Sequence, residues 1–207
     1  MQALRYTILF YLLLAVATLV WAKPIVGLLL GDAYSSAPSI VAALAPSVIL
    51  FGVGEVLAIA VNYLGVAKSR VPLAIGALLI NIVIDIILVP KMGVTAGALG
   101  TGVALVVYVA GHVRICQREM GVSFTSMIPT AVRGLAAASV AGAILFAFGT
   151  DDLTIIDYVA GPPLAALAFV GVLLALRELR PGELRAAVSM LRSRLRGGQD
   201  NGQSQEA

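Results

Sequence analysis

The chain has 207 residues, of which 60% are hydrophobic and 12% are charged, with a formal net charge of +3. A water-soluble domain of this length needs more charge to cover its surface, so the composition excludes that class. A helix needs about 20 apolar residues to cross a hydrocarbon core roughly 30 Å thick. The fold class is therefore predicted to be all-α: a polytopic integral membrane protein.

Six segments are long and apolar enough to span a bilayer, and they are predicted to form one transmembrane domain over residues 1–180. The first follows Arg5 as a secretory signal peptide would, but its apolar part continues to Leu30 with only Lys23-Pro24 as an interruption. We expect it to be retained as a helix, with the Lys23 ammonium reaching a nearby interface. The segments lie near Thr7–Leu30, Ser39–Val66, Val71–Val89, Thr95–Ile115, Met127–Gly149 and Thr154–Leu176.

Charges alternate between the two sides of this predicted domain. The cations of one side are Arg5, Lys68, Arg70, Arg114, Arg118 and the six arginines that follow the sixth segment. The other side carries Asp32, Asp151, Asp152 and Asp157, with Lys91 as its loop cation. The positive-inside rule then places both termini in the cytoplasm of a plasma-membrane protein, as an even number of spans requires. Because the basic residues flank apolar spans, the lipid bilayer is their expected partner and nucleic acid is not.

The stretch after the sixth segment has the pattern of a basic amphipathic helix over residues 181–196. Leu184, Val188, Leu191 and Leu195 recur at helical spacing with arginines between them. Such a helix beside a membrane is expected to lie on anionic headgroups, and a solvated cytoplasmic helix is the alternative. Residues 197–207 have almost no apolar side chain to bury and are predicted to be a disordered tail.

The stretch Pro90-Lys91-Met92-Gly93 separates the third segment from the fourth. Proline removes a backbone donor and restricts the residue before it, so the third helix is predicted to end in this stretch. Gly93 permits a tight reversal into the membrane. Gly93 and Gly97 stand at small-xxx-small spacing, which predicts that the fourth helix packs closely against its neighbours.

Three motifs occur in a fixed order. LLLGDAYSSA follows the first segment, NYLGVAKSRVP ends the second, and NIVIDIILVPKMGVTAGALGTG joins the third to the fourth. Together they resemble the C-terminal part of polysaccharide and oligosaccharide flippases, in the superfamily that includes multidrug and toxin extrusion carriers. In that family the third motif reads N-x-x-x-N-x-x-L-I-P-x-x-G-x-x-G-A-A-x-A-T. Asp85 stands where the family commonly has asparagine, and Gly100 where it commonly has alanine. The matching residues are Asn81, Leu88, Pro90, Gly93, Ala98 and Thr101.

The resemblance implies a carrier of roughly twelve to fourteen helices, in which two lobes rock around a central cavity. Such a carrier would move a lipid-linked oligosaccharide to the outer leaflet for surface polysaccharide synthesis. Six helices correspond to the last six of a fourteen-helix form, so the missing N-terminal helices or a second subunit are expected partners. Two alternatives stay open: a cation-coupled antiporter of drugs or metabolites, and a membrane scaffold that transports nothing.

Four polar residues inside the apolar segments are the candidate site. Glu55 and Asn62 are seven residues apart on one helical face, and Asn81 and Asp85 are four apart on another. An acid at the centre of a spanning helix costs about 2.5–3.5 kcal/mol on insertion scales, so these side chains are expected to avoid lipid. They either line a cavity that binds sugar hydroxyls or a coupling cation, or form hydrogen bonds between helices.

Arg133 is the deepest arginine, about two turns into the fifth segment. Its guanidinium either extends to the inner headgroups or contacts the phosphate of a lipid-linked substrate. Cys116 is expected to be a buried small apolar residue, and His112 an interfacial one. The sequence has no nucleophilic serine motif, phosphate-binding glycine loop or metal-ligand cluster, so neither an enzyme nor a cofactor or metal is predicted.

Overall fold

The structure is a computed structural model that describes residues 1–151, 153–179 and 182–183. The predicted amphipathic helix over 181–196, apart from Gly182 and Glu183, and the predicted disordered tail over 197–207 lie outside the described residues.

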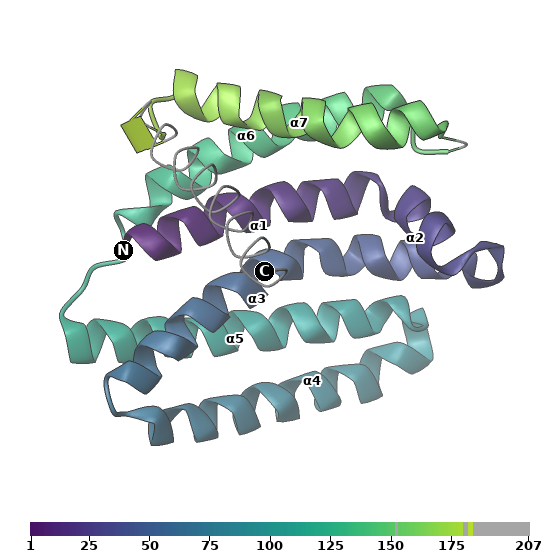
Figure 1. Cartoon of the computed structure of the whole chain (residues 1–207). Helices are drawn as coiled ribbons and strands as arrows, with labels where there is room; N and C mark the ends of the chain where they lie inside the picture. Colours follow the sequence, from purple (N-terminus) through teal and green to yellow (C-terminus); the bar gives the residue numbers. More distant parts are fainter. Residues whose placement is uncertain (152, 180–181, 184–207) are drawn as a thin grey trace, which may run out of the picture.

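The described chain is built from helices, which confirms the predicted all-α class (Figure 1). Six of them are long and apolar enough to span a membrane. Short 3-10 turns lie at Asp32–Tyr34 (η1) and Ala67–Ser69 (η2). The helices are α1 (Gln2–Val20), α2 (Ala22–Leu30), α3 (Ala37–Tyr63), α4 (Arg70–Met92), α5 (Thr95–Met120), α6 (Met127–Phe148) and α7 (Ile155–Ala175).

The first predicted segment is two helices, because the chain breaks at Trp21. Pro24 has no N–H to donate to the carbonyl of Val20, so the helical ladder is interrupted one turn before the proline. The break is fixed from outside the helix. The Trp21 indole is buried and donates to the carbonyl of Leu145 in α6 over 3.0 Å, and its ring packs edge-on against Tyr158 of α7.

Helix α4 ends within the predicted stretch Pro90–Gly93, at its glycine and not at its proline. The helix continues through Pro90 to Met92 and ends at Gly93, whose φ is 74° and whose N–H donates to the carbonyl of Val89. A proline in the last turn loses one backbone bond but keeps a helical φ, whereas the left-handed backbone at Gly93 cannot continue the helix.

Helix α5 is longer than its predicted segment because its polar end remains helical beyond Ile115. It stops at Gly121, whose φ of 65° gives a left-handed cap. Helix α7 begins after a capping box, in which Thr154 and Asp157 each bind the backbone N–H of the other.

The helices pack side by side in the order α7, α6, α1, α3, α5, α4, which differs from their order in the chain (Figure 1). Helices α4 and α7 form the two ends of this row. One apolar core lies among α1, α6 and α7, and a smaller one around Leu57, Val61, Val109 and Cys116 lies between α3 and α5. Cys116 is fully buried and free, which confirms its predicted place in the core.

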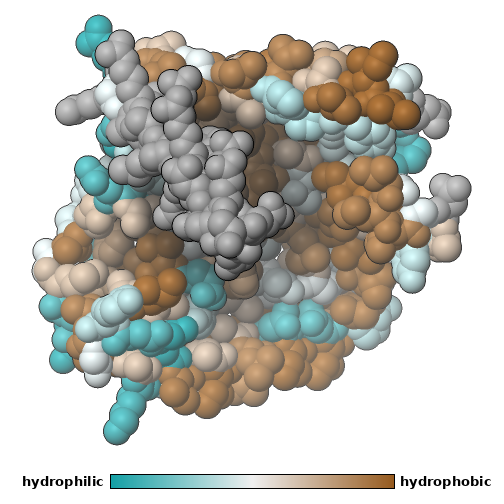
Figure 2. All heavy atoms as spheres, in the orientation of Figure 1, coloured by the Kyte–Doolittle hydropathy of each residue, from teal (hydrophilic) through white to brown (hydrophobic). Residues whose placement is uncertain are grey.

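Much of the surface is apolar. In Figure 2 hydrophobic side chains cover α4 along the bottom of the view, whereas hydrophilic side chains gather at the lower left, around the end of α3 and the start of α4. Within Arg70–Met92, all of which the structure describes, only Ala77 is buried. A helix this exposed and this apolar is suited to lipid or to further membrane helices.

Candidate functional site

A cavity of about 320 Å³ lies among α3, α4 and α5, inside the three membrane-spanning helices. Much of its wall is apolar, with Phe51, Ala77 and Leu105 among the lining residues. Its polar groups come from all three helices and are Glu55, Asn81, Thr101 and Tyr108. The cavity can therefore receive a ligand that has hydroxyl or amide groups as well as apolar surface.

Glu55 and Asn81, two of the predicted site residues, are brought together in this cavity. They belong to segments that the sequence alone could not place side by side. Asn81 directs its amide Nδ2 to the Thr101 hydroxyl at 3.5 Å, and Glu55 is exposed on the face of α3 that borders the cavity. An acid at this depth is costly in lipid, so this face of α3 borders water, protein or ligand.

Asp85 lies one turn along α4 from Asn81, and both side chains face α5. The Oδ1 atom of Asp85 is buried and has no hydrogen-bond partner among the described residues. The close approach of α4 and α5 depends on Gly100, because a Cβ there would stand 2.3 Å from this oxygen and 3.0 Å from the Asn81 amide nitrogen. A buried carboxylate oxygen without a donor is costly unless a proton or a cation satisfies it.

Asn62 lies at the end of α3 and is not a lining residue of the cavity. Its Oδ1 accepts a hydrogen bond of 2.8 Å from Arg70, the first residue of α4. Arg70 also donates to the Tyr108 hydroxyl over 3.2 Å. Tyr108 thus joins Arg70 to the cavity, a link that sequence reasoning missed because it crosses three helices.

His112, which the sequence places near the cytoplasmic end of its span, is fully buried within the protein. Its Nδ1 pairs with the carbonyl of Tyr108 at 2.9 Å, and its ring lies 4.2 Å from the Tyr108 ring. Helix α3 packs against α5, and His112 lies near the end of α5, so its depth relative to a membrane interface stays a prediction.

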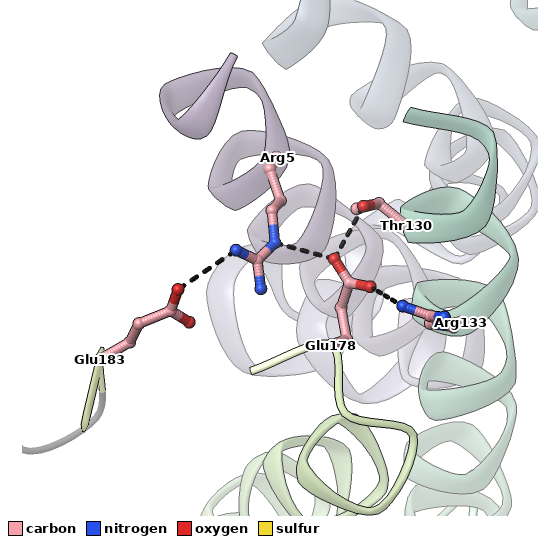
Figure 3. A network of polar contacts seen from close by, with 5 residues as sticks. All are labelled: Arg5, Thr130, Arg133, Glu178 and Glu183. Carbon is pink, nitrogen blue, oxygen red and sulfur yellow. Dashed lines mark hydrogen bonds and ion pairs between the residues drawn. The ribbon is translucent and has the colours of Figure 1, made fainter. Parts of the chain in front are cut away.

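Arg133 belongs to a different cluster, at the ends of α1, α6 and α7 (Figure 3). Its Nη1 donates to Glu178 over 2.8 Å. The same carboxylate accepts from Arg5 over 2.8 Å and from Thr130 over 2.7 Å, and Arg5 also reaches Glu183 at 3.3 Å. The predicted contacts of Arg133 with headgroups or a substrate phosphate are not tested by this arrangement, which occupies one nitrogen of its guanidinium.

Glu178 is the residue that sequence reasoning missed in this cluster. Its side chain is 4% exposed, and burial alone would raise its pKa. The hydrogen bonds from Thr130, Arg133 and Arg5 together outweigh burial and hold the pKa of Glu178 below its ordinary value. The signal available in the sequence was an isolated acid directly after a spanning segment, inside a run of arginines.

No family model, no curated protein and no solved structure matches this chain. The fold and the cavity therefore define its class by themselves. In the residues that the structure describes, the protein is an all-α polytopic membrane protein with six candidate spans and, among three of them, a cavity that has polar groups in a mostly apolar wall.

Proposed function

We propose that the protein is part of a membrane carrier that translocates a lipid-linked oligosaccharide by alternating access. The observation that supports this most directly is the cavity among α3, α4 and α5. It places a carboxylate, an amide and two hydroxyls within spans that are mostly apolar. Such groups hydrogen-bond sugar hydroxyls, and the surrounding apolar wall fits a substrate that travels with a lipid.

The arrangement of the helices supports a role within a larger carrier. The helices form an open row, and Glu55 lies on an exposed face of α3 in the middle of its span. Alternating access needs a second lobe that moves against the first, and such a lobe would cover this face. The missing N-terminal helices or a second subunit are the proposed partner, and the cytoplasmic location of both termini belongs to the same proposal.

The test is transport by membrane vesicles from cells that produce the full chain together with its native partners. Vesicles with wild-type protein should deliver a labelled lipid-linked oligosaccharide to the far leaflet, as measured by its accessibility to a membrane-impermeant reagent. Glu55→Gln should reduce the initial rate by about tenfold, the effect of one charge-assisted hydrogen bond. Glu119→Gln is the matched control, because Glu119 is exposed at the end of α5. Equal rates in the two variants would contradict the proposed role of the cavity.

A cation-coupled antiporter is the second candidate, and the unpartnered Oδ1 of Asp85 favours it. If a cation or a proton drives transport, collapse of the sodium and proton gradients should stop it, and Asp85→Asn should remove the dependence on the gradient. A transport rate that is independent of both gradients would reject this candidate and leave the first one intact.

A further inference from the structure

Arg70 is an arginine without a described counter-ion. Its Nη1 and Nη2 donate to two neutral acceptors, Asn62 Oδ1 and Tyr108 Oη, at 2.8 and 3.2 Å. Its Nε is buried and has no hydrogen-bond partner among the residues that the structure describes. Within the same residues it forms no ion pair, whereas Arg5 and Arg133 share the Glu178 carboxylate.

Among the described residues, no anion therefore faces the charge of Arg70, which is partly buried at the end of the spans. A guanidinium remains protonated at any physiological pH, and neutral oxygens orient it without neutralising it. A partly buried charge beside a low-dielectric region is unfavourable unless an anion faces it. The planar fork of arginine fits phosphate oxygens, and the acceptors on Nη1 and Nη2 hold that fork in one orientation.

The position of Arg70 connects this charge to the cavity. Tyr108 lines the cavity and also binds Arg70, so the guanidinium lies at the cavity's end, where α3 finishes and α4 begins. Glu55 lines the cavity together with Tyr108, and Gly54, the residue before Glu55, faces the Tyr108 ring. From the end of the spans inward, the polar groups are thus the Arg70 guanidinium, the Glu55 carboxylate, and then the Asn81 amide and the Thr101 hydroxyl.

We infer that Arg70 binds a phosphate group of the carrier's ligand at the end of the cavity, and that Asn62 and Tyr108 position its guanidinium. The ligand class is an organic phosphate joined to a neutral polar body, whose hydroxyls reach Glu55, Asn81 and Thr101. This inference rests on the proposed function, because a lipid-linked saccharide has this chemistry. The phosphate of a bulk phospholipid is the other source of the same group.

Binding at equilibrium separates the two sources. The full chain, purified in a phosphate-free maltoside detergent, is titrated with three probes, and bound ligand is counted by native mass spectrometry. The probes are a polyprenyl diphosphate that carries one sugar, the polyprenyl glycoside of that sugar without phosphate, and phosphatidylglycerol. Arg70→Gln should raise the dissociation constant of the diphosphate probe by about tenfold. It should change the dissociation constants of the other two probes by less than about twofold.

Arg114→Gln is the matched control, because Arg114 is exposed on α5 near the same ends of the helices. It should leave all three dissociation constants unchanged. Arg70→Lys keeps the positive charge but loses the planar guanidinium, and should raise the dissociation constant of the diphosphate probe about threefold. This variant also serves if Arg70→Gln does not fold.

Unchanged binding of the diphosphate probe to the Arg70 variants would overturn the inference. Equal weakening of phosphatidylglycerol would overturn it as well, because the phosphate would then be a bulk headgroup. The assay involves no translocation. If vesicles fail to transport while diphosphate binding still depends on Arg70, the proposed function fails and the phosphate site stands.

Discussion

At the scale of single residues, the sequence marks Glu178 as an isolated acid after a span but does not indicate its partners. Its three donors come from the first and sixth helices, so no spacing in the chain connects Arg5, Thr130 and Arg133 with it. By contrast, Glu55, Asn81 and Asp85 could be selected from the sequence, because an acid or amide inside an apolar span is conspicuous and costly. Tyr108, which lines the cavity with Glu55 and Asn81, could not be selected, since tyrosine is common in apolar segments.

Glu178→Gln should lower the free energy of unfolding by about 2 kcal/mol. This value is below the usual cost of breaking a buried ion pair, because the side chains of Arg5 and Arg133 are 19% and 43% exposed. Thermal unfolding in detergent can be followed with a thiol-reactive fluorophore, since the single cysteine is fully buried until the chain unfolds. Glu119→Gln removes only a contact of 3.9 Å between exposed side chains and should change stability by less than about 0.5 kcal/mol.

Wild-type protein and Glu178→Gln should also differ in how their stability depends on pH. The folded pKa of Glu178 lies below its ordinary value, so its carboxylate stabilises the fold at neutral pH and this contribution is lost as the pH falls through the folded pKa. Wild-type protein should therefore lose stability in the acidic range, below about pH 4–5, more steeply than Glu178→Gln. Parallel curves for the two proteins would show that Glu178 is not an ionised partner of the arginines.

At the scale of helices, the positions of the spans followed from hydropathy, but their ends did not. The helix formed by residues 70–92 passes through its proline because a proline in the last turn costs little, and the glycine three residues later ends it. Pro24 indicates in the sequence that the helix could break near Trp21. The groups that fix Trp21 at the break, however, come from α6 and α7. Helix ends and breaks thus depend on contacts that lie outside the helix itself.

Gly100→Ala tests the approach of α4 and α5. The new methyl group would meet the Asp85 carboxylate and the Asn81 amide, so these side chains or the helices must shift, at a cost of about 1–3 kcal/mol. Gly76→Ala is the matched control in α4, because nothing lies within 4 Å of a Cβ built there. It should be neutral or stabilise the helix by up to about 1 kcal/mol. Melting curves that rank the two variants in the opposite order would refute the close packing at Gly100.

At the scale of the whole molecule, the sequence predicts the number of spans and the alternation of charge between their connecting loops. It does not predict which spans pack against each other. Charges in the connecting loops predicted which helix ends lie together, and in the structure the N-terminal end of α1 does meet the residues that follow α7 (Figure 1). The packing order α7, α6, α1, α3, α5, α4 depends on which apolar faces fit each other. Hydropathy does not distinguish a face that packs on protein from one that meets lipid.

Membrane orientation can be measured with two added thiols. Lys91 and Ser126 are exposed at opposite ends of α5, and Cys116 is buried and should remain unlabelled. On intact cells a membrane-impermeant maleimide should label Lys91→Cys and not Ser126→Cys. After permeabilisation the maleimide should label both introduced cysteines. Labelling of both sites before permeabilisation would be incompatible with the predicted topology.

The central place of α1 in the row has a consequence for biosynthesis. Its Leu4–Leu12 surface packs against α6, which leaves the ribosome only after α3, α4 and α5 have been made. During that interval the nascent α1 must keep this surface against lipid or a chaperone, while its other side already receives α3. The α4–α5 hairpin then packs on the α3 side of an early α1–α3 pair, and the α6–α7 hairpin packs on its α1 side. If translation halts in the loop after Met120, the α1 surface that packs against α6 would stay uncovered.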